Sequence, residues 1–536
     1  MTHHGGSAVV ALVIRIFAGL NAWYEASITH RFIAALGRCL RDSVFFGRVY
    51  RYFTTRYDGA YAQGSFVIRA VAWVVGGFFF VLKKIFAFFA RVNETSVNRR
   101  TFSRVMRLFK VEVVRDSLPG RMVSSLPFLF CGFIFFMSVV PHAMWSNMLI
   151  VLAAVFFWGI FILQYFLGRR AGVDLKYLAP MLVLYVLFCV ISFFTGLGGT
   201  DSIRVATIMF AIISLGVFAT NVFETVADIS RCVRFIFLAL VVTGLYGIFQ
   251  YATGIEISAA MVDLELNPGL QRAYSTMGNP NNYAKFIVMF LPFCVAYIFN
   301  VGGDTRFGAT RRQFNVVMLT ALCMPIMLAL MLTYSRASYL ALLVSAFIYI
   351  LMIKPRLIAV GAVLAVLAVP FIPDAIMMRM STIGTDTSSL HRLLIWGSVG
   401  QAIRDYWAQG IGIGPEVFTL IYHAYAPEAA RFIIHSHNVF LSAWLEVGIG
   451  GFIAIILYNL QSLRAGVAAF VNSKDTQTRH YLAAGVSGLA AFFVFGIVEH
   501  VWFYPRTMLV YFLMMGLLWA AVRIDGKACG KAVEAA

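Results

Sequence analysis

Charged residues are scarce in this chain of 536 residues. Asp, Glu, Lys and Arg make up 12% of it, whereas hydrophobic residues make up 61%. A soluble globular domain carries about twice that charged fraction. The hydrophobic residues fall in runs of roughly 17 to 24, and a run of that length can cross the hydrocarbon core of a bilayer as a helix. The composition excludes an ordinary soluble protein and predicts an all-α polytopic membrane protein.

Several motifs that bind metals or nucleotides are also missing. The seven cysteines lie singly without a Cys-x-x-Cys pair, which argues against a zinc site or a disulfide framework. The absence of a Gly-x-x-x-x-Gly-Lys loop argues against ATP hydrolysis. The outer loops predicted below hold no Asp-x-Asp pair, which argues against a metal-dependent nucleotide-sugar enzyme. We expect no cofactor and no metal. The first apolar run contains Arg15 and lacks a clear cleavage site, so no cleavable signal peptide is expected.

Twelve apolar runs are predicted to span the membrane within residues 124–522. We place them at 124–140, 145–168, 178–196, 202–220, 232–251, 284–301, 314–333, 337–353, 357–372, 437–458, 480–498 and 508–522. Lys and Arg concentrate in alternate loops, whereas the short loops 141–144 and 197–201 contain none. By the positive-inside rule, both termini are then cytoplasmic, including a tail at 523–536.

Residues 1–123 form a basic region before the first clear span. They contain 18 Lys and Arg against 6 Asp and Glu, which is +12 of the net charge of +19. Arginines alternate with apolar residues at helical spacing, so we predict amphipathic helices lying on the cytoplasmic face, with a short span at 66–82 as the alternative. We attribute the positive charge to contact with anionic lipid and not with nucleic acid.

Two predicted outer loops, 252–283 and 373–436, are unusually long. Loops of this length in compact proteins are usually functional or disordered. The second loop, between spans nine and ten, is rich in aromatic residues, including Trp396, Trp407 and Tyr422. We therefore expect it to fold into short helices that cap the outer surface.

Basic residues on the predicted outer face run against the charge bias and need a reason. Arg336 lies at a helix boundary in Thr-Tyr-Ser-Arg-Ala-Ser, Arg392 lies in the large loop, and Arg272 precedes a turn. A guanidinium forks onto phosphate oxygens, so these arginines are candidates for binding a diphosphate. The alternatives are that Arg336 reaches lipid headgroups and that Arg392 is a solvated loop charge.

The segment His435-Ser436-His437-Asn438 lies where the large loop enters span ten. His437 is a candidate general base, because imidazole titrates near neutrality. Asn438 could orient it or bind substrate, and Gly448 and Gly451 could let a neighbouring helix pack closely. A purely structural histidine at a helix start is the alternative for His437. His435 creates a His-x-His pair that could ligate metal, but no carboxylate cluster accompanies it.

Other polar residues remain ambiguous. The Gly-Asn-Pro-Asn-Asn run ends the first long loop as a turn, and its amides could also contact a sugar. These amides belong to Asn279, Asn281 and Asn282. Glu446 is costly inside span ten unless it is paired or faces a polar cavity. Glu499 and His500 are interpreted as part of an interfacial belt of aromatic and charged residues.

Taken together, these motifs resemble the O-antigen ligase and O-antigen polymerase superfamily over about residues 125–522. The matching motifs are Arg272-x-Tyr274 with Gly278–Asn282, Ser335-Arg336, Arg392…Trp396 with Gly410-x-Gly412-x-Gly414, and His437-Asn438 with Gly448 and Gly451. The resemblance implies a GT-C-like helical membrane domain that holds an undecaprenyl-diphosphate glycan at the outer leaflet. It further implies that Arg336 and Arg392 contact the diphosphate, and that His437 activates an acceptor hydroxyl, with inversion and without metal.

Further residues of the matching motifs are expected to bind substrate. They are Arg272, Asn279, Asn281, Asn282, Tyr334, Trp396, His435 and Asn438. The favoured function is a glycosyltransferase, either ligase or polymerase, in the bacterial cytoplasmic membrane. Its partners would be the lipid-linked glycan, the lipid bilayer and polysaccharide assembly proteins. A flippase for lipid-linked saccharides and a non-catalytic scaffold of a polysaccharide complex remain the alternatives.

Overall fold

The computed structural model describes most of the chain. The described residues are 41–57, 59–95, 125–166, 170–255, 271–306, 308–371, 374–382, 384 and 386–534, with a few scattered positions before 41. All regular structure in these ranges is helical, without a strand. The prediction of an all-α protein is therefore confirmed.

Each of the twelve expected spans coincides with a helix. These are α9 (Leu126–Val139), α10 (Met148–Phe166), α11 (Pro180–Thr195), α12 (Thr200–Val222), α13 (Val226–Thr253), α14 (Pro280–Gly303), α15 (Ala309–Met331), α16 (Arg336–Ile353), α17 (Leu357–Ala368), α21 (Val439–Asn472), α22 (Thr476–Val498) and α23 (Pro505–Glu534). Nine helices of the described part are long and apolar enough to cross a membrane. A polytopic membrane protein is thus confirmed, whereas α9, α11 and α17 fall short of that length and the count of twelve stays a prediction.

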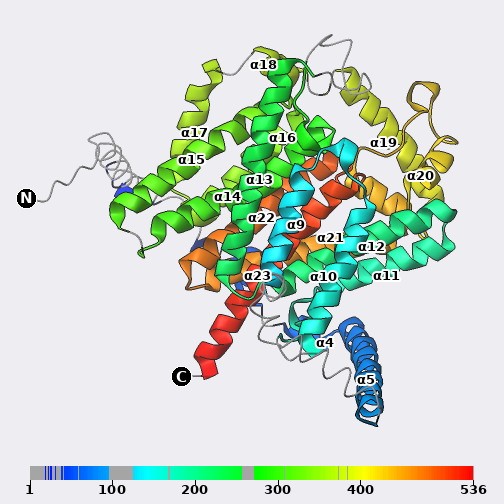
Figure 1. The fold of residues 1–536 in the computed structure, drawn as a ribbon. Helices are drawn as coiled ribbons and strands as arrows, with labels where there is room; N and C mark the ends of the chain where they lie inside the picture. Colours follow the sequence, from blue (N-terminus) through cyan, green and yellow to red (C-terminus); the bar gives the residue numbers. More distant parts are fainter. Residues whose placement is uncertain are drawn as a thin grey trace, which may run out of the picture.

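Helix α23 occupies the centre of the bundle (Figure 1). Small residues let neighbouring helices approach it closely, as is common in membrane proteins. A Cβ atom added at Gly516 would lie 2.6 Å from the carbonyl oxygen of Gly216 on α12, and one at Gly485 of α22 would lie 2.8 Å from Leu518 Cβ. The well-packed centre of the bundle holds the ends of α14 and α22 in fixed positions.

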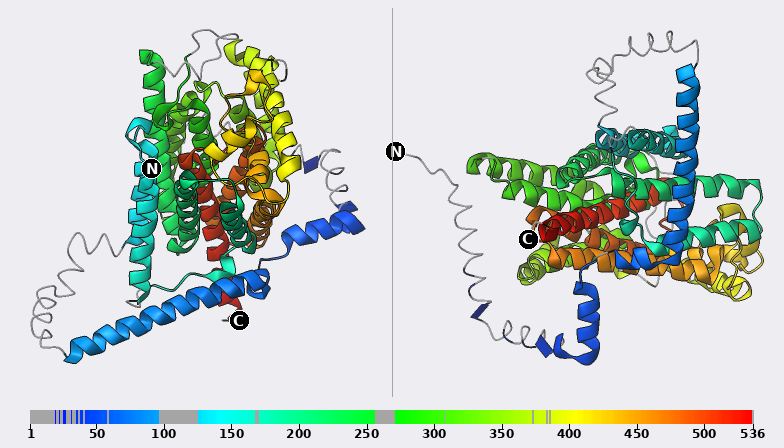
Figure 2. Two further views of the ribbon diagram at one scale, coloured as in Figure 1. Left: turned by 90° about the vertical axis from the view of Figure 1, so that its right-hand side faces the viewer. Right: turned by 90° about the horizontal axis from the view of Figure 1, so that it is seen from below.

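The N-terminal helices lie at one end of the bundle. They are α3 (Val44–Thr54), α4 (Ala60–Gly64) and α5 (Phe66–Thr95). Arg464 and Asn472 of α21 donate hydrogen bonds to backbone carbonyls of α3, and Arg56 pairs with Asp525 at 3.3 Å. Helix α5 crosses below the bundle and does not run among the spans (Figure 2). This placement differs from the alternative of a span at 66–82, and residues 96–124 lie outside the described part.

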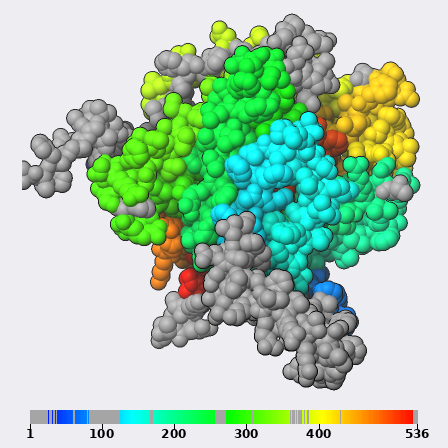
Figure 3. Space-filling model, in the orientation of Figure 1, coloured from blue at the N-terminus to red at the C-terminus, as the bar shows by residue number. Residues whose placement is uncertain are grey.

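The segment between α17 and α21 folds at the opposite end of the bundle (Figures 1 and 3). It contains the 3₁₀ turns η5 (Val369–Phe371) and η6 (Glu428–Ala430) and the helices α18 (Asp374–Ser381), α19 (Thr387–Tyr406) and α20 (Pro415–Tyr422). Ile395, Val399 and Phe418 form a small hydrophobic core with Leu445 of α21. We call this segment the cap. Of the other long loop, residues 256–270 lie outside the described part.

Candidate functional site

A cavity of about 490 Å³ lies between the cap and the ends of α16 and α22. Three arginines line it: Arg272, Arg336 and Arg392. The remaining wall includes Asn281, Tyr334, Trp396 and Glu499, with aliphatic side chains from α16 and α22. We call it the arginine cavity. It brings together motifs that are more than a hundred residues apart in the sequence.

Arg336 begins α16 and faces the cap. Its guanidinium donates to the Asp386 carboxylate at 2.5 Å, and the hydroxyl of Ser389 donates to the same carboxylate. Burial alone would raise the pKa of Asp386, but the hydrogen bonds from Arg336 and Ser389 lower it. This ion pair ties the start of α16 to the start of α19 and holds the guanidinium at the cavity wall.

Glu499 is the charged centre of the site. It follows the last residue of α22 and pairs with Arg392 of α19 at 2.9 Å and with Lys285 of α14 at 3.5 Å. The side chain of Lys285 is only 1% exposed. Burial alone would raise the pKa of Glu499, but the positive charges of Lys285 and Arg392 lower it to about 2. One carboxylate thus holds two cations from different helices beside the cavity.

The Gly-Asn-Pro-Asn-Asn run builds the start of α14. Asn279 caps the helix, because its side-chain oxygen accepts from the backbone N–H groups of Asn281 and Asn282. Asn281 accepts from Arg272 at 3.0 Å and donates to Glu499 at 3.1 Å. Asn282 accepts from Lys285. These asparagines organise the charged groups, and of the three only Asn281 lines the arginine cavity.

Residues 435–438 form a tightly bonded turn, which we call the histidine turn. The Asn438 side chain caps α21 by accepting from the N–H groups of Phe440 and Leu441, and its amide donates to the carbonyl of Ile497 at 2.9 Å. The indole N–H of Trp396 donates to the carbonyl of Ser436 at 3.1 Å. Asn438 and Trp396 thus fix the turn to α22 and to the cap.

His437 sits in this turn with a left-handed backbone, at φ 49°. Its N–H donates to His435 Nδ1 at 3.2 Å, and the two rings lie 4.1 Å apart between centroids. Burial lowers the pKa of His437 to about 4, while the nearby charge of Glu499 opposes this shift. His437 is therefore neutral at pH 7. Its ring is close enough to Glu499 and Arg392 to feel their charges, although it does not line the arginine cavity itself.

Two buried polar atoms at the site lack a hydrogen-bond partner among the described residues. They are Nε of Arg392 and Nδ1 of His437. Leaving a buried donor or acceptor unpaired costs about 1–3 kcal/mol. An unsatisfied buried group in a folded protein therefore needs an explanation, such as a catalytic role or a bound molecule that completes the hydrogen bond.

No group of three or more His, Cys, Asp or Glu side chains in the described part could hold a metal ion. His435 and His437 do lie side by side, as the His-x-His spacing allows. The nearest strong oxygen ligand, Glu499, is already held by two cations. The side chains of His435, His437 and Glu499 are therefore poorly suited to binding a metal ion.

Comparison with known families identifies a segment that carries some of these groups. Residues 319–456 match the family model described as O-antigen ligase. The chain therefore contains an O-antigen ligase domain. No curated protein matches the chain. The matched segment runs from α15 into α21 and contains Arg336, Arg392 and His437, whereas Arg272 and Gly278–Asn282 lie outside it.

The glycine motif of this O-antigen ligase domain breaks a helix. Gly448 has φ 75° inside α21, which leaves the carbonyls of Leu445 and Glu446 without helical partners. The N–H groups of Ile411 and Gly412, from Gly410-Ile-Gly412-Ile-Gly414, donate to these carbonyls. A Cβ at Gly448 would lie 2.2 Å from the Ala408 carbonyl oxygen.

We expected Gly448 to let a neighbouring helix pack closely, and that expectation was wrong. The segment that packs against Gly448 is the cap loop at Ala408. A Cβ at Gly451, in contrast, would approach Phe188 of α11 to 3.4 Å, so a helix does pack there.

Tyr334, which lines the arginine cavity, has a left-handed backbone with φ 47°, and its hydroxyl is 3.3 Å from that of Tyr251.

The sequence did not reveal all residues of the site. Lys285 and Asp386 were not singled out, and Glu499 and His500 were assigned to an interfacial belt. In the structure Glu499 is the shared partner of Lys285 and Arg392, and His500 bonds Ser442 beside the histidine turn. The sequence did contain a signal for Lys285: a charged side chain inside an apolar helix costs free energy unless a buried partner of opposite charge lies beside it.

Proposed function

We propose that this protein, which contains an O-antigen ligase domain, transfers a glycan from an undecaprenyl-diphosphate carrier to an acceptor hydroxyl at the outer face of the cytoplasmic membrane. The observation that carries the proposal is the arginine cavity beside a neutral buried histidine.

The charge balance of the site supports an anionic leaving group. Four cations, Arg272, Lys285, Arg336 and Arg392, stand against the two carboxylates Asp386 and Glu499. Among the described residues at and beside the cavity, these groups carry two more positive than negative charges. A diphosphate diester has an ionised oxygen on each phosphoryl group, so it would neutralise that excess. One of these oxygens would also satisfy the unpartnered Nε of Arg392.

The other part of the same cavity supports a lipid carrier. Its wall continues along aliphatic side chains at the adjoining ends of α16 and α22. These are Leu340 and Val344 of α16, and Val494, Ile497 and Val498 of α22. Leu340 and Ile497 are about half exposed on the bundle surface. A polyprenyl chain could therefore leave the cavity along an apolar path into the bilayer while its diphosphate stays with the arginines.

In the proposed reaction, the acceptor oxygen attacks the anomeric carbon while its proton passes to the neutral imidazole of His437. The bond from the anomeric carbon to the diphosphate oxygen breaks, and undecaprenyl diphosphate leaves with the electron pair. Attack opposite the leaving group inverts the anomeric centre. Arg336 and Arg392 stabilise the charge that develops on the leaving oxygen, so the fixed guanidinium groups supply what a metal supplies elsewhere.

The test compares site variants with matched controls in a purified transfer assay. His437→Ala and Arg336→Ala should each lower the transfer rate at least a hundredfold. His423→Ala and Arg431→Ala change the same residue types on the cap, away from the arginine cavity, and should transfer at nearly the normal rate. Full activity of His437→Ala would overturn the role of this residue.

The same preparations separate the alternatives. Movement of a lipid-linked saccharide across vesicles without glycan transfer would identify a flippase. Normal polysaccharide assembly by the double variant Arg336→Ala and His437→Ala would identify a scaffold. Ligase and polymerase are distinguished by the lipid-linked glycans that accumulate when the protein is removed: long chains indicate a ligase and single repeats a polymerase.

A further inference from the structure

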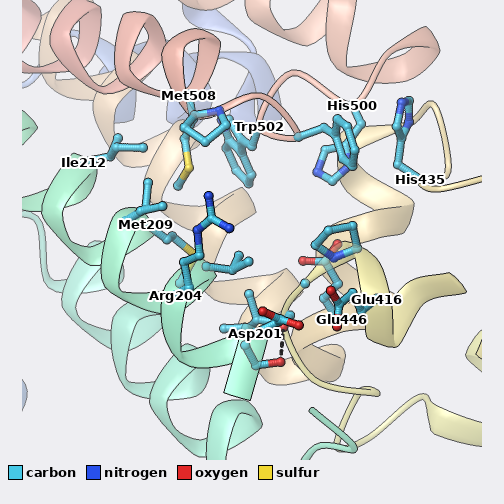
Figure 4. Close-up of a pocket in the computed structure, with 18 of the residues that line it drawn as sticks. Asp201, Arg204, Met209, Ile212, Glu416, His435, Glu446, His500, Trp502 and Met508 are labelled. Carbon is cyan, nitrogen blue, oxygen red and sulfur yellow. Dashed lines mark hydrogen bonds between the residues drawn. The ribbon is translucent and has the colours of Figure 1, made fainter. Parts of the chain in front are cut away.

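A second cavity, of about 300 Å³, lies on the other side of the histidine turn. It is enclosed by the start of α12, the cap loop before α20, the first half of α21 and the segment after α22. Figure 4 shows Asp201 and Arg204 of α12 facing His435, His500 and Trp502 across it. None of the predicted substrate residues except His435 lines this cavity.

Two pairs of neighbouring residues separate the second cavity from the arginine cavity. Glu499 lines the arginine cavity, whereas the next residue, His500, lines the second one. His435 lines the second cavity, and its ring lies 4.1 Å from that of His437, which senses the charges of Glu499 and Arg392. The wall between the cavities is thus only about one layer of side chains thick, and the candidate base lies in it.

Several polar atoms in this second cavity have no hydrogen-bond partner among the described residues. His435 and His500 are 9% and 8% exposed, and each uses Nδ1 in a hydrogen bond within the histidine turn or to Ser442. No described residue bonds their Nε2 atoms. The indole N–H of Trp502 is buried and also lacks a partner among the described residues. A ligand with several hydroxyl groups would satisfy such scattered donors and acceptors.

Carboxyl groups outnumber basic side chains among the described residues that line the cavity. Asp201, Glu416 and Glu446 line it, against the single cation Arg204. Glu446 lies just before the break in α21, and no described residue forms an ion pair with it. The sequence already required that Glu446 be paired or face a polar cavity, and it faces this one (Figure 4). Carboxyl oxygens accept hydrogen bonds from hydroxyl groups, whichever protonation state they are in.

We propose that this second cavity binds the acceptor as an uncharged, hydroxyl-rich saccharide and presents one of its hydroxyl groups to the histidine turn. The ring of Trp502 offers an apolar surface for the C–H face of the sugar, and Glu446 accepts hydrogen bonds from its hydroxyl groups. Arg204 is the only Lys or Arg among the described residues that line the cavity, so a carboxylate or phosphate on the sugar would find few positively charged partners. The inference rests on the proposed function, because it names the substrate that accepts the glycan.

Binding by the two cavities is tested separately with variants that fill each one. Ala443 lines the second cavity and Ala337 lines the arginine cavity. Saturation-transfer NMR on the purified full chain measures binding of methyl glucoside and of glucuronic acid, and a separate titration measures binding of undecaprenyl diphosphate. Ala443→Phe should abolish the methyl glucoside signal and leave undecaprenyl diphosphate binding unchanged. Ala337→Phe should have the opposite effect.

A second variant covers the case in which Ala443→Phe does not fold. Glu446→Gln keeps the size of the side chain and should weaken methyl glucoside binding about tenfold, since an amide N–H replaces one of the carboxyl oxygens that accept from the sugar. Methyl glucoside binding that both variants leave unchanged, or a preference of the unaltered protein for glucuronic acid, would overturn the inference.

The binding experiment and the transfer assay can refute the acceptor site and the transferase function separately. If methyl glucoside binds in the second cavity but no glycan is ever transferred, the saccharide site stands and the proposed transferase function fails. If transfer occurs and the KM for the acceptor is the same in Glu446→Gln as in the unaltered protein, the transferase stands and the acceptor site fails.

Discussion

Replacing Glu499 by Gln should destabilise the protein strongly. The carboxylate is 8% exposed and pairs with Lys285, which is 1% exposed, and with Arg392. Removing one partner of a buried ion pair leaves an uncompensated charge and typically costs about 3–5 kcal/mol. Gln can still accept a hydrogen bond but cannot neutralise Lys285, so we expect a loss near the middle of that range.

Reversible unfolding of the purified protein in mixed micelles measures this effect. Glu428→Gln is the matched control, because Glu428 pairs with Arg431 on the cap while 81% of its side chain is exposed, and such a pair contributes at most about 1 kcal/mol. Adding Lys285→Met to Glu499→Gln should restore part of the stability, since it removes the unpaired buried charge. Equal unfolding midpoints for Glu499→Gln and Glu428→Gln would refute the reasoning.

Three further predictions concern the histidine turn and the broken helix. Lowering the pH should leave kcat/KM for transfer constant until His437 is protonated near pH 4, because burial depresses its pKa; a fall centred near pH 6.5 would contradict this burial. Asn438→Ala should lower the unfolding midpoint, with a loss of about 1–2 kcal/mol from the helix cap, whereas Asn438→Asp should keep most of the stability. Gly448→Ala should prevent stable folding, because its Cβ would overlap the Ala408 carbonyl, and Gly132→Ala in open space should not, as thermal unfolding of both would show.

The helices at the twelve predicted spans were predictable because hydropathy is a local property. All twelve predicted spans coincide with helices, since each run of apolar residues specifies its own helix wherever it packs. Arg336 and Arg392 were predictable for a related reason: basic residues on the expected outer face violate the charge bias. The His437-Asn438 pair was found from its place at the start of an apolar helix.

The carboxylates of the site were not predictable in the same way. Asp386 is 50 residues from Arg336, and Glu499 is 107 residues from Arg392. Ion pairs between residues so far apart depend on how helices pack, and sequence spacing carries no signal for them. The break at Gly448 was missed because a glycine in an apolar helix also suits close helix packing.

Reconstituted vesicles that contain a synthetic undecaprenyl-diphosphate oligosaccharide and an acceptor saccharide test the central claim most directly. The measurement is the amount of undecaprenyl diphosphate released for each glycosidic bond formed, without added metal. We predict one molecule released per bond by the unaltered protein, and neither product from His437→Ala. Bond formation by His437→Ala at the normal rate, or oligosaccharide crossing the bilayer with no release of undecaprenyl diphosphate, would contradict it.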